Sequence, residues 1–223
     1  MTLSGISRWR AVWKWIADRV RDVAYALLVA VLWPIVTAAF RVTVRGRTNL
    51  RSHGVVVAPH RSYWDIPLLC VACGPFRRIT FLARSSHLRN PVLAPLVWAF
   101  AAAIDRDAFG VRDFRRAMAA AARARLLGIF PEGTTRPGAQ PKPGAIRFAE
   151  HLGYPLVPVN LVAHGPYPPA RFLRIPVRLP RIEVRIGPPV TVDELAREMS
   201  ADLRRSDRHR VLTQRLMERI HEA

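Results

Sequence analysis

The chain beyond Arg41 alternates short apolar runs with longer stretches in which apolar residues recur at helical spacing. Short runs rich in valine, isoleucine and leucine are typical of strands, and the longer stretches are typical of helices. The predicted strands are residues 41–45, 55–59, 79–83, 101–104, 126–130, 156–162 and 182–186. The predicted helices are residues 64–73, 91–100, 112–125, 142–151, 192–199 and 207–221. Strands separated by helices indicate an α/β domain, and we expect a mixed central sheet flanked by helices.

The first forty residues follow a different pattern. At the ~100° per residue of a helix, five apolar side chains fall within one arc and charged side chains occupy the opposite side. The apolar set is Trp9, Val12, Trp13, Ile16 and Val20, and the charged set is Arg10, Lys14, Asp18 and Arg21. A basic amphipathic helix with tryptophan on its apolar face suits the plane of a membrane interface. The alternative is an ordinary helix that docks on the domain core.

An uncharged run, residues 23–40, follows this amphipathic stretch. The run is at the short limit for crossing a bilayer, which takes about 20 residues, and Pro34 interrupts it. We therefore expect a segment that dips into or lies under one leaflet, with a full span as the alternative. The simplest organisation is a membrane-associated helical segment over residues 1–40 and one α/β domain over residues 41–223.

The net charge of the chain indicates which classes of partner it binds. Lys and Arg outnumber Asp and Glu by 35 to 16, which gives a formal net charge of +19. Such an excess indicates an anionic partner, either nucleic acid, a lipid surface or a small phosphorylated substrate. No recognised nucleic-acid-binding motif is present, and three of the six tryptophans fall near the N-terminus, which favours the membrane.

The two cysteines, Cys70 and Cys73, form a Cys-x-x-Cys pair. A structural zinc site needs four ligands, and no second pair at suitable spacing exists. Both cysteines lie in an apolar helical stretch, so we interpret them as small buried residues. Nothing indicates a disulfide framework, which fits a reducing cytoplasmic setting.

His60 and Asp65 are the first candidates for chemistry. They lie between the strand 55–59 and the helix 64–73, too far apart in angle to share one helix face. They can meet if His60 lies on the loop that follows the strand and Asp65 lies in the first turn of the helix. Asp65 would then accept a hydrogen bond from one ring nitrogen and leave the other nitrogen as a base.

Three further motifs stand in or directly after predicted strands. Arg106, in the pair Asp105–Arg106, can fork two hydrogen bonds to a phosphate, although a surface ion pair is the alternative. The run from Phe130 to Thr134 opens into a Gly/Thr turn whose backbone amides can cradle an anion or an oxyanion. Within it, Glu132 can hydrogen-bond a substrate hydroxyl. Pro158 interrupts a strand ladder, which predicts an edge strand or a bend.

In order and spacing, these motifs resemble the glycerolipid acyltransferase superfamily, and within it the bacterial 1-acylglycerol-3-phosphate acyltransferases, over roughly residues 40–190. His60 and Asp65 match the His-x4-Asp catalytic motif of that family. The other matches are Asp105 and Arg106 to the second block, Phe130 to Thr134 to the third, Lys142 and Gly144 to a Lys-x-Gly that often follows, and Pro158 to the fourth. The arginine that often follows the third block is displaced by Thr135 to Arg136.

The resemblance implies transfer of a fatty acyl chain from acyl-CoA or acyl carrier protein to the free hydroxyl of a lysophospholipid. The expected acceptor is 1-acylglycerol-3-phosphate, the expected product phosphatidic acid, and the expected location the cytoplasmic face of the cell membrane. His60 is expected to act as general base, oriented by Asp65, with no metal or cofactor. The expected substrate-binding residues are Arg106, Glu132, Gly133, Thr134, Arg136 and Lys142.

Two alternatives stay open at this point. The acceptor can be another lysolipid, such as an ornithine lipid precursor or a glycolipid. More remotely, the chain can be a non-catalytic basic protein that binds lipid or nucleic acid. A serine nucleophile is not expected, because no Gly-x-Ser-x-Gly motif is present.

Overall fold

The computed structural model describes residues 3–89, 91, 93–104, 110–168, 179–197, 199 and 203–223. A seven-stranded sheet runs through the domain in the order β1-β7-β6-β2-β5-β3-β4. Its strands are β1 (Thr43–Arg45), β2 (Gly54–Val57), β3 (Ile79–Arg84), β4 (Ala101–Ile104), β5 (Leu126–Ile129), β6 (Leu156–His164) and β7 (Arg181–Ile186). Neighbouring strands are parallel except β6 and β7, which are antiparallel. The predicted mixed α/β sheet is confirmed, and each predicted strand is present.

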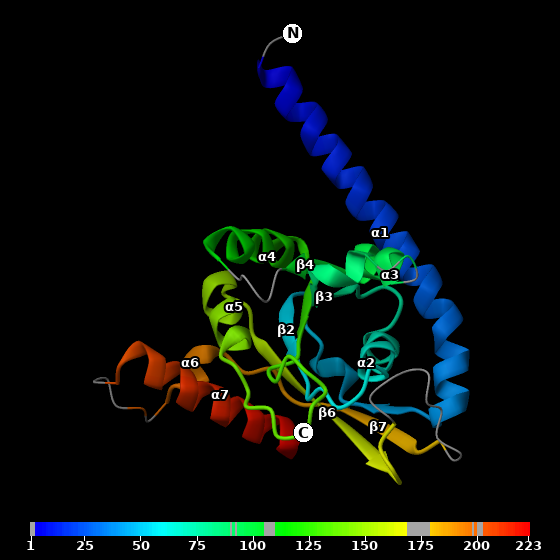
Figure 1. Ribbon diagram of the computed structural model, residues 1–223, viewed down its shortest axis with the longest axis vertical. Coiled ribbons are helices and arrows are strands. Elements are labelled where there is room, and N and C mark those ends of the chain that lie inside the picture. The colour runs from blue at the N-terminus through cyan, green and yellow to red at the C-terminus, as the bar shows by residue number, and fades with distance from the viewer. Residues whose placement is uncertain are drawn as a thin grey trace.

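Helices cover both faces of the sheet (Figure 1). They are α1 (Leu3–Phe40), α2 (Asp65–Cys73), α3 (Leu93–Phe100), α4 (Val111–Arg123), α5 (Gly144–Leu152), α6 (Val192–Leu195) and α7 (Arg205–Glu222). Successive side chains of a strand point to opposite faces, so Val56 packs in the core on the α1–α2 side, whereas Val55 and Val57 pack in the core on the α5–α7 side. The predicted helix 192–199 is shorter than expected and ends at Leu195.

Helix α1 is one continuous element of 38 residues that includes both the amphipathic stretch and the uncharged run. At 1.5 Å per residue it is about 57 Å long, and its N-terminal half extends beyond the domain (Figure 1). Pro34 lies inside the helix and is exposed. A proline in a helix interior costs about 3 kcal/mol. The burial of Val36 and Phe40 on the domain core offsets this cost.

The two faces of α1 differ. On one face Tyr25, Val29, Val36 and Phe40 are fully buried against the domain, and Arg47 links this region to α2. The Arg47 guanidinium lies 5.3 Å from the Trp33 ring and its Nε donates to the carbonyl of Ala72 at 3.1 Å. The opposite face leaves large apolar side chains exposed. They are Trp9, Val12, Trp13, Trp15, Ile16, Val20, Val23, Leu27, Val31 and Ile35.

By length and composition, Val12–Phe40 is able to cross a membrane. Its 29 residues include an 18-residue window of mean hydropathy 2.2, and it is the one such helix within the described part of the chain. A single helix of this kind is weak evidence on its own, because core helices and signal sequences share these properties.

Two smaller expectations are also settled by the fold. Cys70 and Cys73 are buried and free, as interpreted from the sequence, and burial raises the pKa of the Cys73 thiol to about 12. Pro158 lies in β6, an interior strand, so the expected edge position is wrong. The proline stands where β6 pairs with Val57 of β2, one residue before its pairing with β7 begins at Val159. The proline, which has no N–H to donate, therefore lies at the point where the pairing of β6 changes from β2 to β7.

Candidate active site

His60 and Asp65 meet at the carboxyl edge of the parallel strands. His60 follows β2 by three residues, and Asp65 is the first residue of α2. The Nδ1 atom of His60 lies 3.1 Å from Oδ2 of Asp65. The imidazole side chain is 12% exposed, whereas the Asp65 side chain is fully buried. The structure therefore contains the contact that the spacing predicted, and with Nδ1 engaged, Nε2 is the nitrogen left for a substrate.

The Asp65 carboxylate is held by donors on both oxygens. Oδ2 accepts from the backbone N–H groups of Arg61 and Ser62, at 2.7 and 2.8 Å, in addition to the His60 contact. Oδ1 accepts from the Tyr167 hydroxyl at 2.7 Å. These donors hold the buried carboxylate in one position beside His60. The Ser62 side-chain oxygen accepts from the Trp64 N–H at 3.2 Å, just before α2 begins.

Tyr167 is a member of the site that the sequence did not reveal. It lies in the Gly-Pro-Tyr-Pro-Pro run after β6, which the sequence indicated only as a surface loop. Burial, and then the charge of Asp65, raise the pKa of Tyr167 far above its usual range, so the hydroxyl remains a donor. The Arg61 guanidinium lies 4.0 Å from the centre of the tyrosine ring and donates to the carbonyl of Leu161. An aromatic residue amid prolines was the only available signal.

We expect Tyr167→Phe to lower kcat by about three- to tenfold with little change in KM, because Tyr167 acts on the imidazole only through Asp65, which keeps its donors from Arg61 and Ser62. Without this donor, more of the Asp65 charge acts on the imidazole and favours its protonated form. The acid limb of the pH–rate profile should therefore move to higher pH. A profile that is superimposable on the wild-type profile would show that Tyr167 only packs the loop.

Stacked aromatic rings fix the plane of the His60 imidazole. Its ring lies 4.1 Å from the ring of Phe130, centre to centre, with an interplanar angle of 17°. Phe130 in turn lies 5.6 Å from Phe81 of β3. This stack depends on Gly128, since a Cβ there would lie 2.5 Å from the ring of Phe81. The glycine in β5 thereby leaves room for the ring that supports Phe130 and His60.

The loop after β5 closes on itself beside His60. Its Gly133 has φ 64°, a left-handed conformation that favours glycine. The Gly133 N–H donates to the Phe130 carbonyl at 3.0 Å, so it is engaged in the turn rather than held ready for an oxyanion. The Lys142 N–H donates to the Pro131 carbonyl, and this bond ties the two ends of the loop together. The expected anion cradle must therefore use other groups.

The remaining predicted residues differ in burial, and two of them lie outside the described part of the chain. Glu132 follows β5, the neighbour of β2, and its Oε2 is buried with no hydrogen-bond partner in the described part of the chain. Thr134 is half-buried and its hydroxyl accepts from the Arg136 N–H at 3.3 Å, while the Arg136 and Lys142 residues are exposed. Asp105 and Arg106 lie outside the described residues. The roles of all of these residues stay predictions.

An imidazole oriented by a buried carboxylate at the carboxyl edge of an α/β sheet is the arrangement of an enzyme that uses a general base. The family model named Acyltransferase matches residues 41–162, more than half of the chain. The chain therefore belongs to this family and is an acyltransferase.

The comparison with solved structures supports the fold. The chain is similar to the crystal structure of the 1-acyl-sn-glycerophosphate (LPA) acyltransferase PlsC from Thermotoga maritima, with a TM-score of 0.55 and 22% sequence identity. The match covers 87% of this chain and 80% of that one. No curated protein matches the sequence significantly. At this identity the likeness concerns the fold alone.

Proposed function

We propose that the protein transfers a fatty acyl chain from an acyl thioester, acyl-CoA or acyl carrier protein, to the free hydroxyl of 1-acylglycerol-3-phosphate and so forms phosphatidic acid. The observation that carries this proposal is the His60–Asp65 pair, at 3.1 Å, inside a domain of the Acyltransferase family. The shared fold with an enzyme described as an LPA acyltransferase supports the choice of acceptor.

The proposed reaction needs one base and no covalent acyl-enzyme. Nε2 of His60 takes the proton of the acceptor hydroxyl while the hydroxyl oxygen attacks the thioester carbonyl carbon. The tetrahedral intermediate then expels the thiolate as the C–S bond breaks, and the imidazolium returns the proton to sulfur. The products are the new ester and a free thiol. Asp65 fixes the ring tautomer and stabilises the imidazolium that exists between the two proton transfers.

The acceptor phosphate must be held to one side for its neighbouring hydroxyl to reach His60. Arg106 is the first candidate by motif, followed by Lys142 and Arg136, and arginine suits the task because its planar fork makes two parallel bonds to phosphate. Glu132 is proposed to accept from an acceptor hydroxyl, since its buried Oε2 has no partner among the described residues. Gly133 and Thr134 shape the turn that presents it.

We further propose that α1 attaches the enzyme to the cytoplasmic face of the cell membrane, where both acceptor and product reside. Its exposed apolar face, from Trp9 to Ile35, supports this proposal. Purely electrostatic binding is screened at high salt, with a Debye length of about 3 Å at 1 M, whereas apolar insertion is not. We expect high salt to leave the protein on vesicles and detergent to release it. Complete release by salt alone would contradict insertion.

The acceptor is tested by incubating purified enzyme and radiolabelled acyl-CoA with a panel of acceptors. The panel contains 1-acylglycerol-3-phosphate, the same lipid without its phosphate, an ornithine lipid precursor and a lyso-glycolipid. We expect labelled phosphatidic acid as the main product and little transfer to the unphosphorylated lipid. Preferred labelling of the ornithine or sugar lipid would reassign the acceptor and keep the acyltransferase activity. Labelling of none would contradict the proposal with this donor, and the panel is then repeated with acyl carrier protein.

A further inference from the structure

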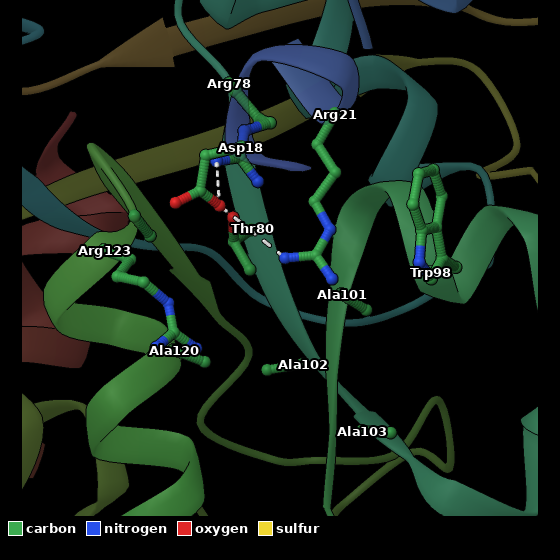
Figure 2. A pocket seen from close by; sticks show the side chains of 11 residues that line it. Asp18, Arg21, Arg78, Thr80, Trp98, Ala101, Ala102, Ala103, Ala120 and Arg123 are labelled. Atoms are coloured by element: carbon green, nitrogen blue, oxygen red, sulfur yellow. Dashed lines mark ion pairs between the residues drawn. The ribbon is translucent and has the colours of Figure 1, made fainter. Parts of the chain in front are cut away.

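A pocket of about 230 Å³ lies between α1, α3 and α4, away from His60 (Figure 2). Two of its lining residues, Thr80 and Ala124, stand at the amino ends of β3 and β5. His60 and Glu132 follow the carboxyl ends of β2 and β5. Strands β2 and β3 both pair with β5 in parallel, so all three strands run in the same direction. The pocket and the candidate active site therefore occupy opposite edges of the sheet, and the mechanism above does not use the pocket.

Three guanidinium groups line this pocket. Arg21 comes from α1, Arg78 from the residue before β3, and Arg123 from the end of α4. Figure 2 shows Arg21 and Arg123 entering the same space from different helices. The wall along β4 consists of small side chains, which leave that space open. They are Ala101, Ala102 and Ala103.

Nearby carboxylates neutralise these cations only in part. Asp22 accepts from Nε of Arg78 at 2.8 Å, so these two side chains form a hydrogen-bonded ion pair. Asp18, which also lines the pocket, lies 3.6 Å from Arg21 and 3.9 Å from Arg78. Both distances exceed the roughly 2.7–2.9 Å of a charge-assisted hydrogen bond. Arg123 has no ion pair within the described residues, so three cations face two carboxylates and donors remain free.

Two buried polar atoms point to a missing ligand. The Thr80 hydroxyl is without a hydrogen-bond partner among the described residues, although Thr80 is only 7% exposed. The same holds for Nε of Arg21, whose guanidinium lies 5.3 Å from the Trp98 ring that holds it in place. Buried polar groups are nearly always paired in folded proteins. A guanidinium N–H can only donate and a hydroxyl can also donate, so a group rich in acceptor oxygens would satisfy both atoms.

We propose that this pocket binds a phosphate group, as a phosphate ester distinct from the acceptor at His60. Phosphate oxygens satisfy the fork of an arginine and the hydroxyl of Thr80 together. The pocket borders the part of α1 where Trp15, Val20 and Val23 are exposed, which favours a phosphate carried by a lipid headgroup. A soluble phosphate ester offers the same chemistry, so the experiment includes a probe of each kind.

The test measures binding to the full-length protein in a neutral detergent by titration calorimetry. The two probes are a short-chain phosphatidic acid and glycerol 3-phosphate. Four proteins are compared: wild type, Arg123→Ala, Thr80→Val and the control Arg125→Ala, an exposed arginine next to the pocket residue Ala124 but outside the lining. The acceptor site at His60 contributes equally in all four, so differences among them report on the pocket.

We expect binding to weaken about tenfold in Arg123→Ala and about threefold in Thr80→Val, and by less than about twofold in Arg125→Ala. Weakening with the lipid probe alone assigns a lipid phosphate, and weakening with both probes assigns a phosphate ester of either source. Wild-type affinity for both probes in Arg123→Ala and Thr80→Val overturns the proposal. Equal weakening in Arg125→Ala overturns it too, because only surface charge would then be acting. Thermal unfolding of each variant confirms that it is folded.

Discussion

Replacing His60 with alanine should lower kcat by about 10²–10⁴-fold and leave the protein folded. The loss is large because Nε2 is the only nitrogen of the His–Asp pair left for the acceptor proton. The fold should survive because the Asp65 carboxylate keeps the donors from Arg61, Ser62 and Tyr167. The measurement is turnover at saturating donor and acceptor, together with the thermal unfolding midpoint.

A matched control for this change is His53→Ala. His53 is an exposed histidine that contacts Ser52 and Tyr154 outside the candidate site. It should retain wild-type turnover, so that a loss in His60→Ala cannot be attributed to removal of any imidazole. Near wild-type turnover in folded His60→Ala would show that another group takes the acceptor proton.

Asp65→Asn should lower kcat by about 10²-fold, at the low end of the range expected for the loss of His60 itself. Asparagine keeps the shape of the side chain, so its oxygen can occupy the place of Oδ2 and accept from His60, Arg61 and Ser62. Its amide then faces the Tyr167 hydroxyl, which can turn and accept. What is lost is the negative charge that stabilises the imidazolium formed during the reaction.

The double variant His60→Ala/Asp65→Asn distinguishes this mechanism from a structural role of Asp65. If Asp65 acts through His60, adding Asp65→Asn to His60→Ala should cost little further turnover, because residues that act as a unit are not additive. A further loss of about 10²-fold in the double variant would show that Asp65 acts independently of the histidine.

The strands and the His60–Asp65 contact could be predicted because both depend on local pattern. Apolar runs bounded by polar residues mark strands such as β5 and β7, and a five-residue spacing across a strand–helix junction brings His60 to Asp65. Helix α1 was expected from the sequence as a helical segment over residues 1–40. Its continuity through Pro34 depends on burial of Val36 and Phe40 on the domain, which no local pattern reveals.

Contacts between residues distant in sequence could not be predicted from the sequence. Tyr167 lies 102 residues from the carboxylate that it binds. The requirement for Gly128 arises only when β3 lies beside β5 and places Phe81 over the glycine. The pocket between α1, α3 and α4 likewise combines residues from position 18 to position 124. Such groupings follow from strand order, and the sequence predicted the strands but not their order.

The most direct test of the account follows free thiol and phosphatidic acid together after mixing enzyme, acyl-CoA and 1-acylglycerol-3-phosphate. Direct attack by an acceptor activated at His60 predicts one thiol released for each phosphatidic acid formed, with no release before the acceptor is added. It also predicts that the rates of formation of both products fall together, by about 10²–10⁴-fold, in His60→Ala. Thiol release without acceptor, with the acyl chain left on the protein, would contradict the account.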